Sequence, residues 1–277
     1  MSDDARDLDA DRRLIVETIR AAGDCALSYY GKPLKAWDKA PGHPVTEADL
    51  AVDALIRDRL CAARPDYGWL SEESADDPAR LDRARVWIVD PIDGTRAFMR
   101  NQPEFSISVA LVEHGRPLLG AISQPVAGRL YLAVQGTGAT LNDRRLRIAP
   151  RTSLGDSRML ADETFFRSAR HWPTPWPDMR YRRLPSIALR LAMVGGGEAD
   201  ATVFVRPKSD WDVAAGDLVV TEAGGRCCDE TGAPPVYNRK TPVQPCLAAA
   251  SACLMPALLA RIAPAMAQYR ARIAAQK

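Results

Sequence analysis

Apolar and polar residues recur with two different periods along the chain. Between residues 9 and 30 the apolar positions are three or four residues apart: Ile15, Ile19, Ala22, Ala26 and Tyr30. This spacing predicts a helix with one buried face, ending at Gly31. The same spacing predicts a second helix from Thr46 to about Ala63. The apolar run at 86–89 is too short for a helix and predicts a buried strand.

The pattern changes from residue 105 onward. Residues 105–125 predict two strands joined by a turn at His114-Gly115, and residues 129–142 predict another pair around residues 136–138. Consecutive hairpins form an antiparallel meander. We therefore expect residues 1–150 to form an α+β half with two helices on one side of a largely antiparallel sheet.

Residues 151–277 predict an alternating α/β half. The expected strands are 158–162, 180–184, 201–205 and 247–251. The expected helices are 186–194, 212–223 and a terminal helix interrupted near Pro264. The Pro/Trp-rich segment 171–178 is interpreted as a surface loop. No long linker separates the halves, so we expect them to share one site and to form a single catalytic unit.

Composition and charge exclude several classes of protein. A hydrophobic content of 47% and a net charge of +2 describe an ordinary globular protein without the basic footprint of a nucleic-acid-binding protein. No apolar run approaches the roughly 20 residues needed to span a bilayer. The six cysteines lack CxxC spacing and are interpreted as reduced thiols. The polar N-terminus has no apolar signal core, so we expect a cytoplasmic location.

The segment VWIVDPIDGTRAF, residues 86–98, ends the predicted strand in two carboxylates, Asp90 and Asp93. Pro91 favours an extended Asp90, after which the chain can turn and bring both carboxylates to one point. Two buried like charges raise each other's pKa unless a cation balances them. Oxygen ligands without His or Cys favour Mg²⁺ or Mn²⁺. A turn of solvated aspartates is the alternative.

Other polar residues each have a structural interpretation when taken alone. Glu72 follows a short predicted strand and could be a solvated loop charge. Asp212 begins a helix and could be an N-cap, as could Ser186. Asp49 lies three residues after Thr46, the spacing of a capping box. The combination of these acidic residues with Asp90 and Asp93 favours a metal site.

A covalent aspartyl-phosphate mechanism is disfavoured. Hydrolases of the haloacid dehalogenase type follow a strand with DxDGT, in which the first Asp is the nucleophile. Pro91 occupies that position here, and Asp90 lies one residue too early.

Four blocks occur in order along the chain: PVTEAD (44–49), SEE (71–73), DPIDGTRAF (90–98) and WDVAAGDLVVTEAGG (211–225). With these blocks the chain resembles the inositol monophosphatase superfamily of lithium-sensitive, Mg²⁺-dependent phosphatases over about residues 10–260. The resemblance implies the layered αβαβα sandwich of the inositol monophosphatase/fructose bisphosphatase type. It also implies two or three Mg²⁺ ions, with Mn²⁺ as an alternative.

The resemblance also implies roles for individual residues. Glu72, Asp90 and the Ile92 carbonyl would bind the first metal, and Glu72 would also touch a third. Asp90, Asp93 and Asp212 would bind the second metal. The catalytic residues would be Glu72 together with Asp49 and Thr95, which orient and deprotonate the attacking water. The amides of Gly94 and Thr95 would hold the phosphate, with Ser186 near the substrate.

The substrate is predicted from departures from the family pattern. Inositol monophosphatases usually have Asn where this chain has Ala97, and an acidic residue where it has Val205. Arg206 and Lys208 follow and would suit a second phosphate, unless they are solvated loop charges. We therefore favour the 3'(2'),5'-bisphosphate nucleotidase branch, acting on adenosine 3',5'-bisphosphate.

Other functions remain open from the sequence. The main alternative is inositol-1-phosphate phosphatase, followed by histidinol-phosphate or fructose-1,6-bisphosphate phosphatase. A non-catalytic scaffold is disfavoured because every expected carboxylate is present. The expected partner is a small phosphate ester, with no nucleic acid polymer and no membrane, and both monomer and homodimer are compatible with the sequence.

Overall fold

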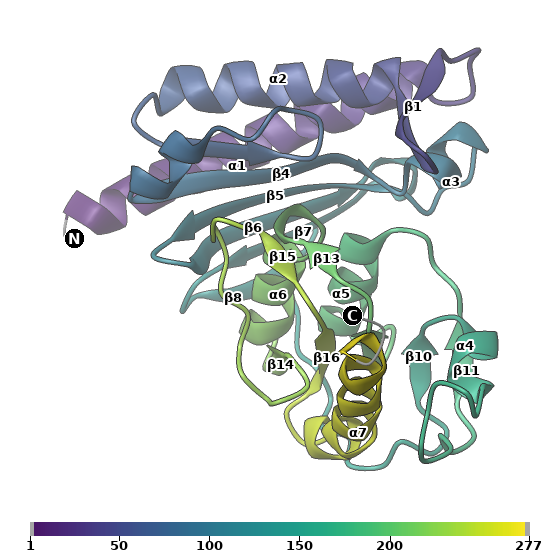
Figure 1. Ribbon diagram of the computed structural model, residues 1–277. Coiled ribbons are helices and arrows are strands. Elements are labelled where there is room, and N and C mark those ends of the chain that lie inside the picture. Colours follow the sequence, from purple (N-terminus) through teal and green to yellow (C-terminus); the bar gives the residue numbers. More distant parts are fainter. Residues whose placement is uncertain (1–2, 275–277) are drawn as a thin grey trace.

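Helical layers and sheets alternate through the computed structural model, which describes residues 3–274 (Figure 1). Helices α1 (Asp3–Tyr29) and α2 (Glu47–Ala63) lie side by side on the outer face of a seven-stranded sheet. Helices α5 (Ile187–Gly195) and α6 (Asp210–Glu222) separate this sheet from a five-stranded one, whose far face is covered by α7 (Met255–Ala274). The predicted αβαβα sandwich is confirmed.

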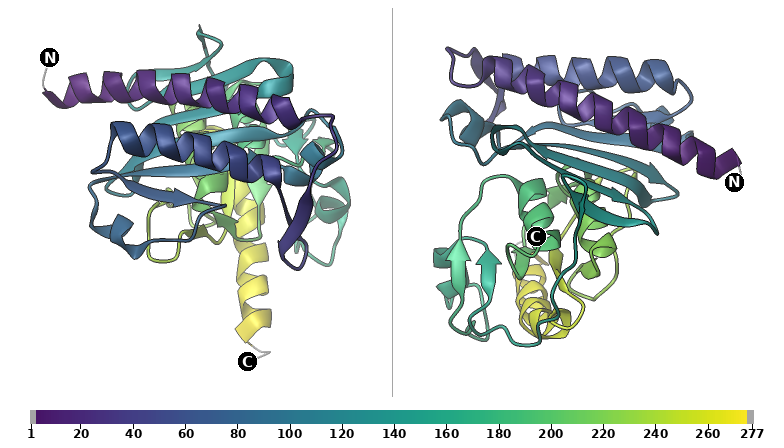
Figure 2. Two further views of the ribbon diagram at one scale, coloured as in Figure 1. Left: turned by 90° about the horizontal axis from the view of Figure 1, so that it is seen from above. Right: turned by 180° about the vertical axis from the view of Figure 1, so that it is seen from behind.

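The two outer helices follow the predicted apolar spacing. Ile15, Ile19, Ile56 and Leu60 are fully buried against the sheet. Helix α1 begins at Asp3, earlier than predicted, and the pair Arg12 Nε–Asp9 Oδ1 at 3.2 Å lies in its N-terminal part. Figure 2 shows both helices crossing the sheet.

The seven-stranded sheet runs in chain order. Its strands are β3 (Gly68–Ser71), β4 (Arg85–Asp93), β5 (Ser106–Glu113), β6 (Arg116–Gln124), β7 (Arg129–Val134), β8 (Gly138–Leu141) and β9 (Arg144–Arg145). Strands β3 and β4 are parallel, and every later neighbour is antiparallel, so the predicted meander is confirmed. The β5–β6 turn has positive φ at His114 (48°) and Gly115 (76°), as a two-residue hairpin requires.

The second sheet is mixed. Its order is β11 (Arg180–Arg182), β10 (Arg158–Leu160), β12 (Ala201–Phe204), β16 (Leu247–Ser251) and β14 (Gly225–Cys228). Strand β10 is parallel to β11 and β12, whereas β16 is antiparallel to β12 and β14. The smaller helical elements are α3 (Thr95–Met99), α4 (Glu163–Arg167) and the 3₁₀ turns Pro78–Asp82 and Pro125–Ala127. Two further antiparallel pairs are the hairpin of β1 (Ala36–Ala40) with β2 (His43–Thr46) and the pair of β13 (Lys208–Ser209) with the distant β15 (Val243–Gln244).

One sequence prediction in the C-terminal half was wrong, and another was correct except at one residue. Pro264 lies inside α7 and does not interrupt it, because Leu258 and Ile262 before it and Met266 after it are buried against the sheet. This packing offsets the roughly 3 kcal/mol that an interior proline costs a helix. The loop 171–178 is not wholly on the surface either, since Trp172 is buried in the same cluster.

The core joins both halves of the chain. The central cluster combines inner-face residues of the first sheet, such as Ile88, with α5, α6 and Phe204 of the second sheet. The proposed division at residue 150 falls between β9 and β10, and it stays a prediction. All six cysteines are free thiols. Within residues 3–274, no helix is long and apolar enough to cross a membrane.

Candidate active site

A β-bulge at the end of β4 sets the direction of Asp90 and Asp93. Asp90 pairs with Ser108 of β5, but Asp93 pairs with Ser106, so β4 carries one extra residue. In a regular strand, residues three apart point to opposite faces. The bulge at Pro91-Ile92 therefore lets both carboxylates approach one side, and Pro91 has no N–H to leave unpaired there.

Carboxylates from three elements meet at this point. Glu72, Asp90 and Asp212 each offer an oxygen, and these oxygens lie within 4.8 Å of one another. Glu72 directly follows β3, and its N–H donates to the Val89 carbonyl at 3.2 Å, which places it beside Asp90. Asp212 lies in the first turn of α6, where its carboxylate accepts from the Ser209 N–H at 2.9 Å. Asp212 is therefore not the N-cap, which is Ser209; it is the third residue of a capping box and also belongs to the cluster.

The cluster carries more negative charge than its surroundings neutralise. Burial, followed by repulsion from Glu72, Asp93 and Asp212, raises the pKa of Asp90 well above its ordinary value. Burial, with Asp93 and Glu72, likewise raises the pKa of Asp212 to about 8. Among the described residues, buried Asp90 Oδ1 has no hydrogen-bond partner. An all-oxygen donor set with an orphaned carboxylate oxygen fits a hard divalent cation such as Mg²⁺.

Asp93 is held by the start of α5. The Ser186 hydroxyl and the Ala188 N–H each donate to Asp93 Oδ2 at 2.6 Å. Ser186 also accepts from the Leu189 N–H at 3.0 Å, so it is the N-cap of α5 as well as a neighbour of the site. Burial raises the pKa of Asp93 to about 6, against the lowering effect of these hydrogen bonds. The N-cap interpretation of Ser186 is therefore confirmed, and its place near the substrate stays a prediction.

Asp49 and Thr95 form a pair beside the cluster. Thr95 Oγ1 lies 3.2 Å from Asp49 Oδ1 and 3.2 Å from the Ile92 carbonyl. The capping box predicted at the start of α2 is present, and the Thr46 N–H donates to Asp49 Oδ2 at 2.9 Å. Burial raises the pKa of Asp49 to about 6. Gly94, with φ 99°, precedes α3 in a conformation that side chains rarely adopt.

Lys39 is a neighbour of the site that the sequence analysis missed. It lies on the β1–β2 pair, and its Nζ is 2.8 Å from Glu72 Oε1 and 2.7 Å from Glu73 Oε1. Burial raises the pKa of Glu73 to about 7 even though Lys39 opposes the shift. No periodic pattern marks residues 36–46 as strands, so a single lysine there carried no signal.

A cavity of about 340 Å³ is lined by Arg190 of α5 and Lys208, which precedes α6, the two helices that begin beside Asp93 and Asp212. The charged side chains that line it, among the described residues, are Arg183, Arg190, Arg206, Lys208 and Asp162. Burial lowers the pKa of Lys208, while the negative charge of Asp212 opposes the shift most strongly. Arg206 lies on the outer, exposed side of the cavity. Val205 lines the same cavity, whereas Ala97 is buried in α3 and only 1% exposed.

Arg190 was not found from the sequence. It projects from α5 with its Nε donating to the Leu184 carbonyl at 2.5 Å, and its guanidinium lies 5.6 Å from the Phe204 ring centroid. Burial lowers the pKa of Arg190, and the nearby Asp93 opposes the shift. A lone arginine within a helical apolar pattern gives no sign that it faces a cavity.

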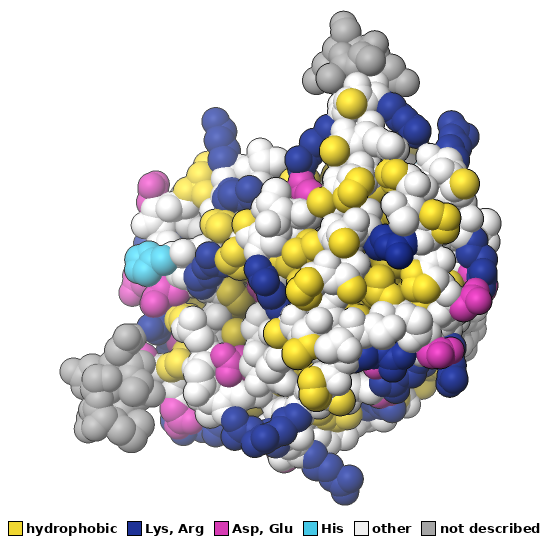
Figure 3. All heavy atoms as spheres, turned by 90° about the horizontal axis from the view of Figure 1, so that it is seen from below, with side chains coloured by type: hydrophobic (Ala, Val, Ile, Leu, Met, Phe, Trp, Pro, Cys, Tyr) yellow, Lys and Arg dark blue, Asp and Glu magenta, His cyan; other side chains and the backbone are white. Residues whose placement is uncertain are grey.

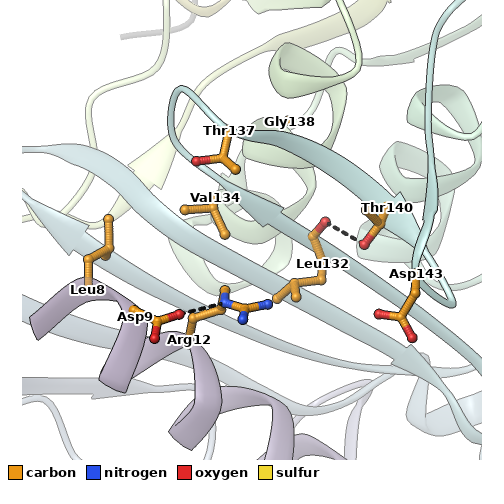
Figure 4. A pocket seen from close by; sticks show the side chains of 9 residues that line it. All are labelled: Leu8, Asp9, Arg12, Leu132, Val134, Thr137, Gly138, Thr140 and Asp143. Atoms are coloured by element: carbon orange, nitrogen blue, oxygen red, sulfur yellow. Dashed lines mark hydrogen bonds and ion pairs between the residues drawn. The ribbon is translucent and has the colours of Figure 1, made fainter. Parts of the chain in front are cut away.

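A separate hollow of about 390 Å³ lies between α1 and the strands β7 and β8 (Figure 4). None of the predicted site residues lines it. Arg12 points across this hollow but is paired with Asp9 of its own helix. The chemistry-bearing residues are therefore gathered elsewhere, around the carboxylate cluster.

Comparison with known proteins agrees with this geometry. The sequence model of the inositol monophosphatase family matches residues 7–270. The chain belongs to this family. Members of the family are Mg²⁺-dependent phosphatases, so the predicted enzyme class is confirmed.

Relatives and solved structures extend the match along the chain. Inositol-1-monophosphatase of Rhizobium meliloti is 35% identical, over 79% of this chain and 85% of that protein. Nus factor SuhB of Xylella fastidiosa is 36% identical, over 79% of this chain and 82% of that protein. The crystal structure of SuhB from Bartonella henselae superposes with a TM-score of 0.78 at 30% identity, covering 93% of this chain and 98% of that one.

Proposed function

We propose that this phosphatase hydrolyses a small phosphate monoester at the Glu72–Asp90–Asp212 cluster. The observation that carries the proposal is the convergence of the three carboxylates, whose ligand oxygens lie within 4.8 Å of one another. Glu72, Asp90, the Ile92 carbonyl, Asp93 and Asp212 would hold two or three Mg²⁺ ions. When bound, such ions neutralise developing charge on the phosphoryl oxygens and make water a better nucleophile.

The protein's own contribution is positioning and proton transfer. Thr95 lies between Asp49 and the end of β4, so its hydroxyl can orient a water for in-line attack and pass a proton toward Asp49. The capping box fixes the other Asp49 oxygen, which leaves Oδ1 for this role. A pKa of about 6 lets Asp49 accept a proton near neutral pH. The amides of Gly94 and Thr95 would hold the phosphate.

The charge of the cavity supports a substrate with a second anionic group. Lys208 and Arg190 are attracted by Asp212 and Asp93, which would be neutralised once metal ions bind. A second phosphate would then supply the missing negative charge. Adenosine 3',5'-bisphosphate fits this requirement, and it remains our proposed substrate. Ser186 would contribute indirectly, by orienting Asp93.

Inositol 1-phosphate is the second candidate. It is favoured by the name of the Rhizobium meliloti relative, inositol-1-monophosphatase, at 35% identity. No bisphosphate nucleotidase is among the relatives compared above, so the inositol alternative has at least equal support from the comparisons. The cavity argues the other way, because Val205 offers no acidic group for inositol hydroxyls.

A substrate panel distinguishes the candidates. Phosphate release is measured with Mg²⁺ from adenosine 3',5'-bisphosphate, inositol 1-phosphate, histidinol phosphate and fructose 1,6-bisphosphate. We expect the highest kcat/KM for the first, inhibition by Li⁺, and loss of activity in Asp90→Asn and in excess chelator. A higher kcat/KM for inositol 1-phosphate would overturn the bisphosphate assignment. Full activity in chelator would overturn the metal mechanism. The cytoplasmic location stays a prediction.

A further inference from the structure

A second cavity, of about 360 Å³, lies next to the 340 Å³ cavity lined by Arg190 and Lys208. The two share Phe165, Val205 and Arg206 in their linings, so they meet at the end of β12. The second cavity lies between the C-terminal half of α7 and the segment that carries His171 and Trp172. In the view from below, hydrophobic side chains gather at the centre of the face and are flanked by Lys and Arg (Figure 3).

The walls of this cavity are aromatic and basic. Tyr269, on α7, is 48% exposed, and His171 is also exposed. The His171 ring lies 4.6 Å from that of Phe165, centroid to centroid, with the two ring planes tilted by 35°, so two adjacent rings line the facing wall. Arg206 and Arg272 are the charged residues of the lining, and no described carboxylate lines it. A flat ligand attached to an anionic group complements this chemistry.

Hydrogen bonds connect residues within the segment 165–175 and join this segment to α7. The Trp172 Nε1–H donates to the Phe165 carbonyl at 3.1 Å, which fixes the buried indole below the exposed rings. Arg272 donates to the Arg170 carbonyl at 3.4 Å, and Arg261 donates to that of Pro175. These contacts join the segment 165–175 to α7, so both walls of the cavity are held in place before a ligand arrives, which lowers the entropic cost of binding.

We infer that this second cavity is a binding site for the base of a nucleotide substrate, whose phosphates lie toward Lys208. This inference rests on the proposed function. Stacking on exposed aromatic rings suits any base, because every base has a π-face. Arg206, at the junction of the two cavities, would contact the linking phosphate or ribose. Tyr269 and His171 would then decide affinity for nucleotides, without a part in the chemistry.

The test is a kinetic comparison of Tyr269→Ala and His171→Ala with wild type. Loss of a stacking partner is worth about a tenfold change in affinity. We expect KM for adenosine 3',5'-bisphosphate to rise about tenfold with kcat within twofold, and KM for inositol 1-phosphate, which has no base, to stay unchanged. Leu27→Ala, an exposed apolar side chain on α1, is the matched control. Equal KM values for the variants and wild type, or equal shifts for both substrates, would overturn the inference.

A binding measurement separates this inference from the proposed function. Adenosine 5'-monophosphate and ribose 5-phosphate are titrated into wild type and Tyr269→Ala by calorimetry, without turnover. We expect the base-containing ligand to bind wild type more tightly, and only that ligand to weaken about tenfold in the variant. Equal affinities of the two ligands for wild type would refute a base site, even in an active phosphatase. A base-dependent difference in an inactive protein would retain the base site and refute the proposed catalysis.

Discussion

Replacement of Asp212 by Asn should stabilise the metal-free protein while it abolishes activity. The exchange removes one charge from the cluster and keeps the side-chain oxygen that accepts from Ser209 at 2.9 Å, so the start of α6 is retained. Burial and repulsion raise the pKa of Asp212 from 3.8 to about 8. In wild type this carboxyl group therefore opposes folding at neutral pH, and Asn carries no such cost.

The magnitude follows from linkage between ionisation and folding. A pKa raised from 3.8 to about 8 corresponds to about 6 kcal/mol against the folded state at pH 8 and above. The new amide N–H₂ group would be buried without a hydrogen-bond acceptor, which costs about 1–3 kcal/mol. We expect a net gain of about 3–5 kcal/mol at pH 8. The gain should be lost as pH falls from about 8 toward 4, because Asp212 is then protonated in the folded state and approaches its unfolded pKa of 3.8.

Urea unfolding in chelator, between pH 4 and pH 9, measures the effect. Wild type should lose stability as pH rises from about 4 to about 8, and added Mg²⁺ should restore it. Asp212→Asn should show a flatter profile and a weaker response to Mg²⁺. Asp66→Asn, at an exposed aspartate, controls for the exchange itself. A less stable Asp212→Asn at pH 8 would refute the repulsion argument, and an undiminished Mg²⁺ response would show that Asp212 binds no metal.

Three further predictions follow from single contacts. Asp49→Asn should lower kcat at least about 100-fold, with little change in the Mg²⁺ affinity measured by calorimetry. The activity of the wild type should fall below a pH of about 6, as Asp49 is protonated. An Asp49→Asn variant with nearly wild-type activity would show that Asp49 is not the base. Ser186→Ala should cost about 1 kcal/mol in urea unfolding, because α5 loses its N-cap. Gly216→Ala should cost about 1–3 kcal/mol, because its Cβ would lie 2.5 Å from Leu191 Cβ between α5 and α6; an unchanged midpoint would contradict that close packing.

Local patterns were sufficient for most of the elements. The spacing of Ile15, Ile19 and Ala22 predicted α1, and the His114-Gly115 turn predicted the β5–β6 hairpin, because both depend on contacts between near neighbours in sequence. Predictions failed where distant packing decided the outcome. Pro264 stays inside a helix only because α7 is packed on the second sheet, and Trp172 is buried only because α7 and α4 cover it.

The sequence by itself determined the chemistry of this protein: the carboxylates, their order along the chain and the bulge-forming proline after Asp90, which together imply a hard-cation site and the family. Only the tertiary structure decided what surrounds that site. Lys39 reaches Glu72 from a separate strand pair, and Arg190 and Lys208 meet in one cavity from different elements. Ligand type follows from residue identity, which a sequence displays, whereas the charge and shape of a cavity depend on packing between segments far apart in the chain.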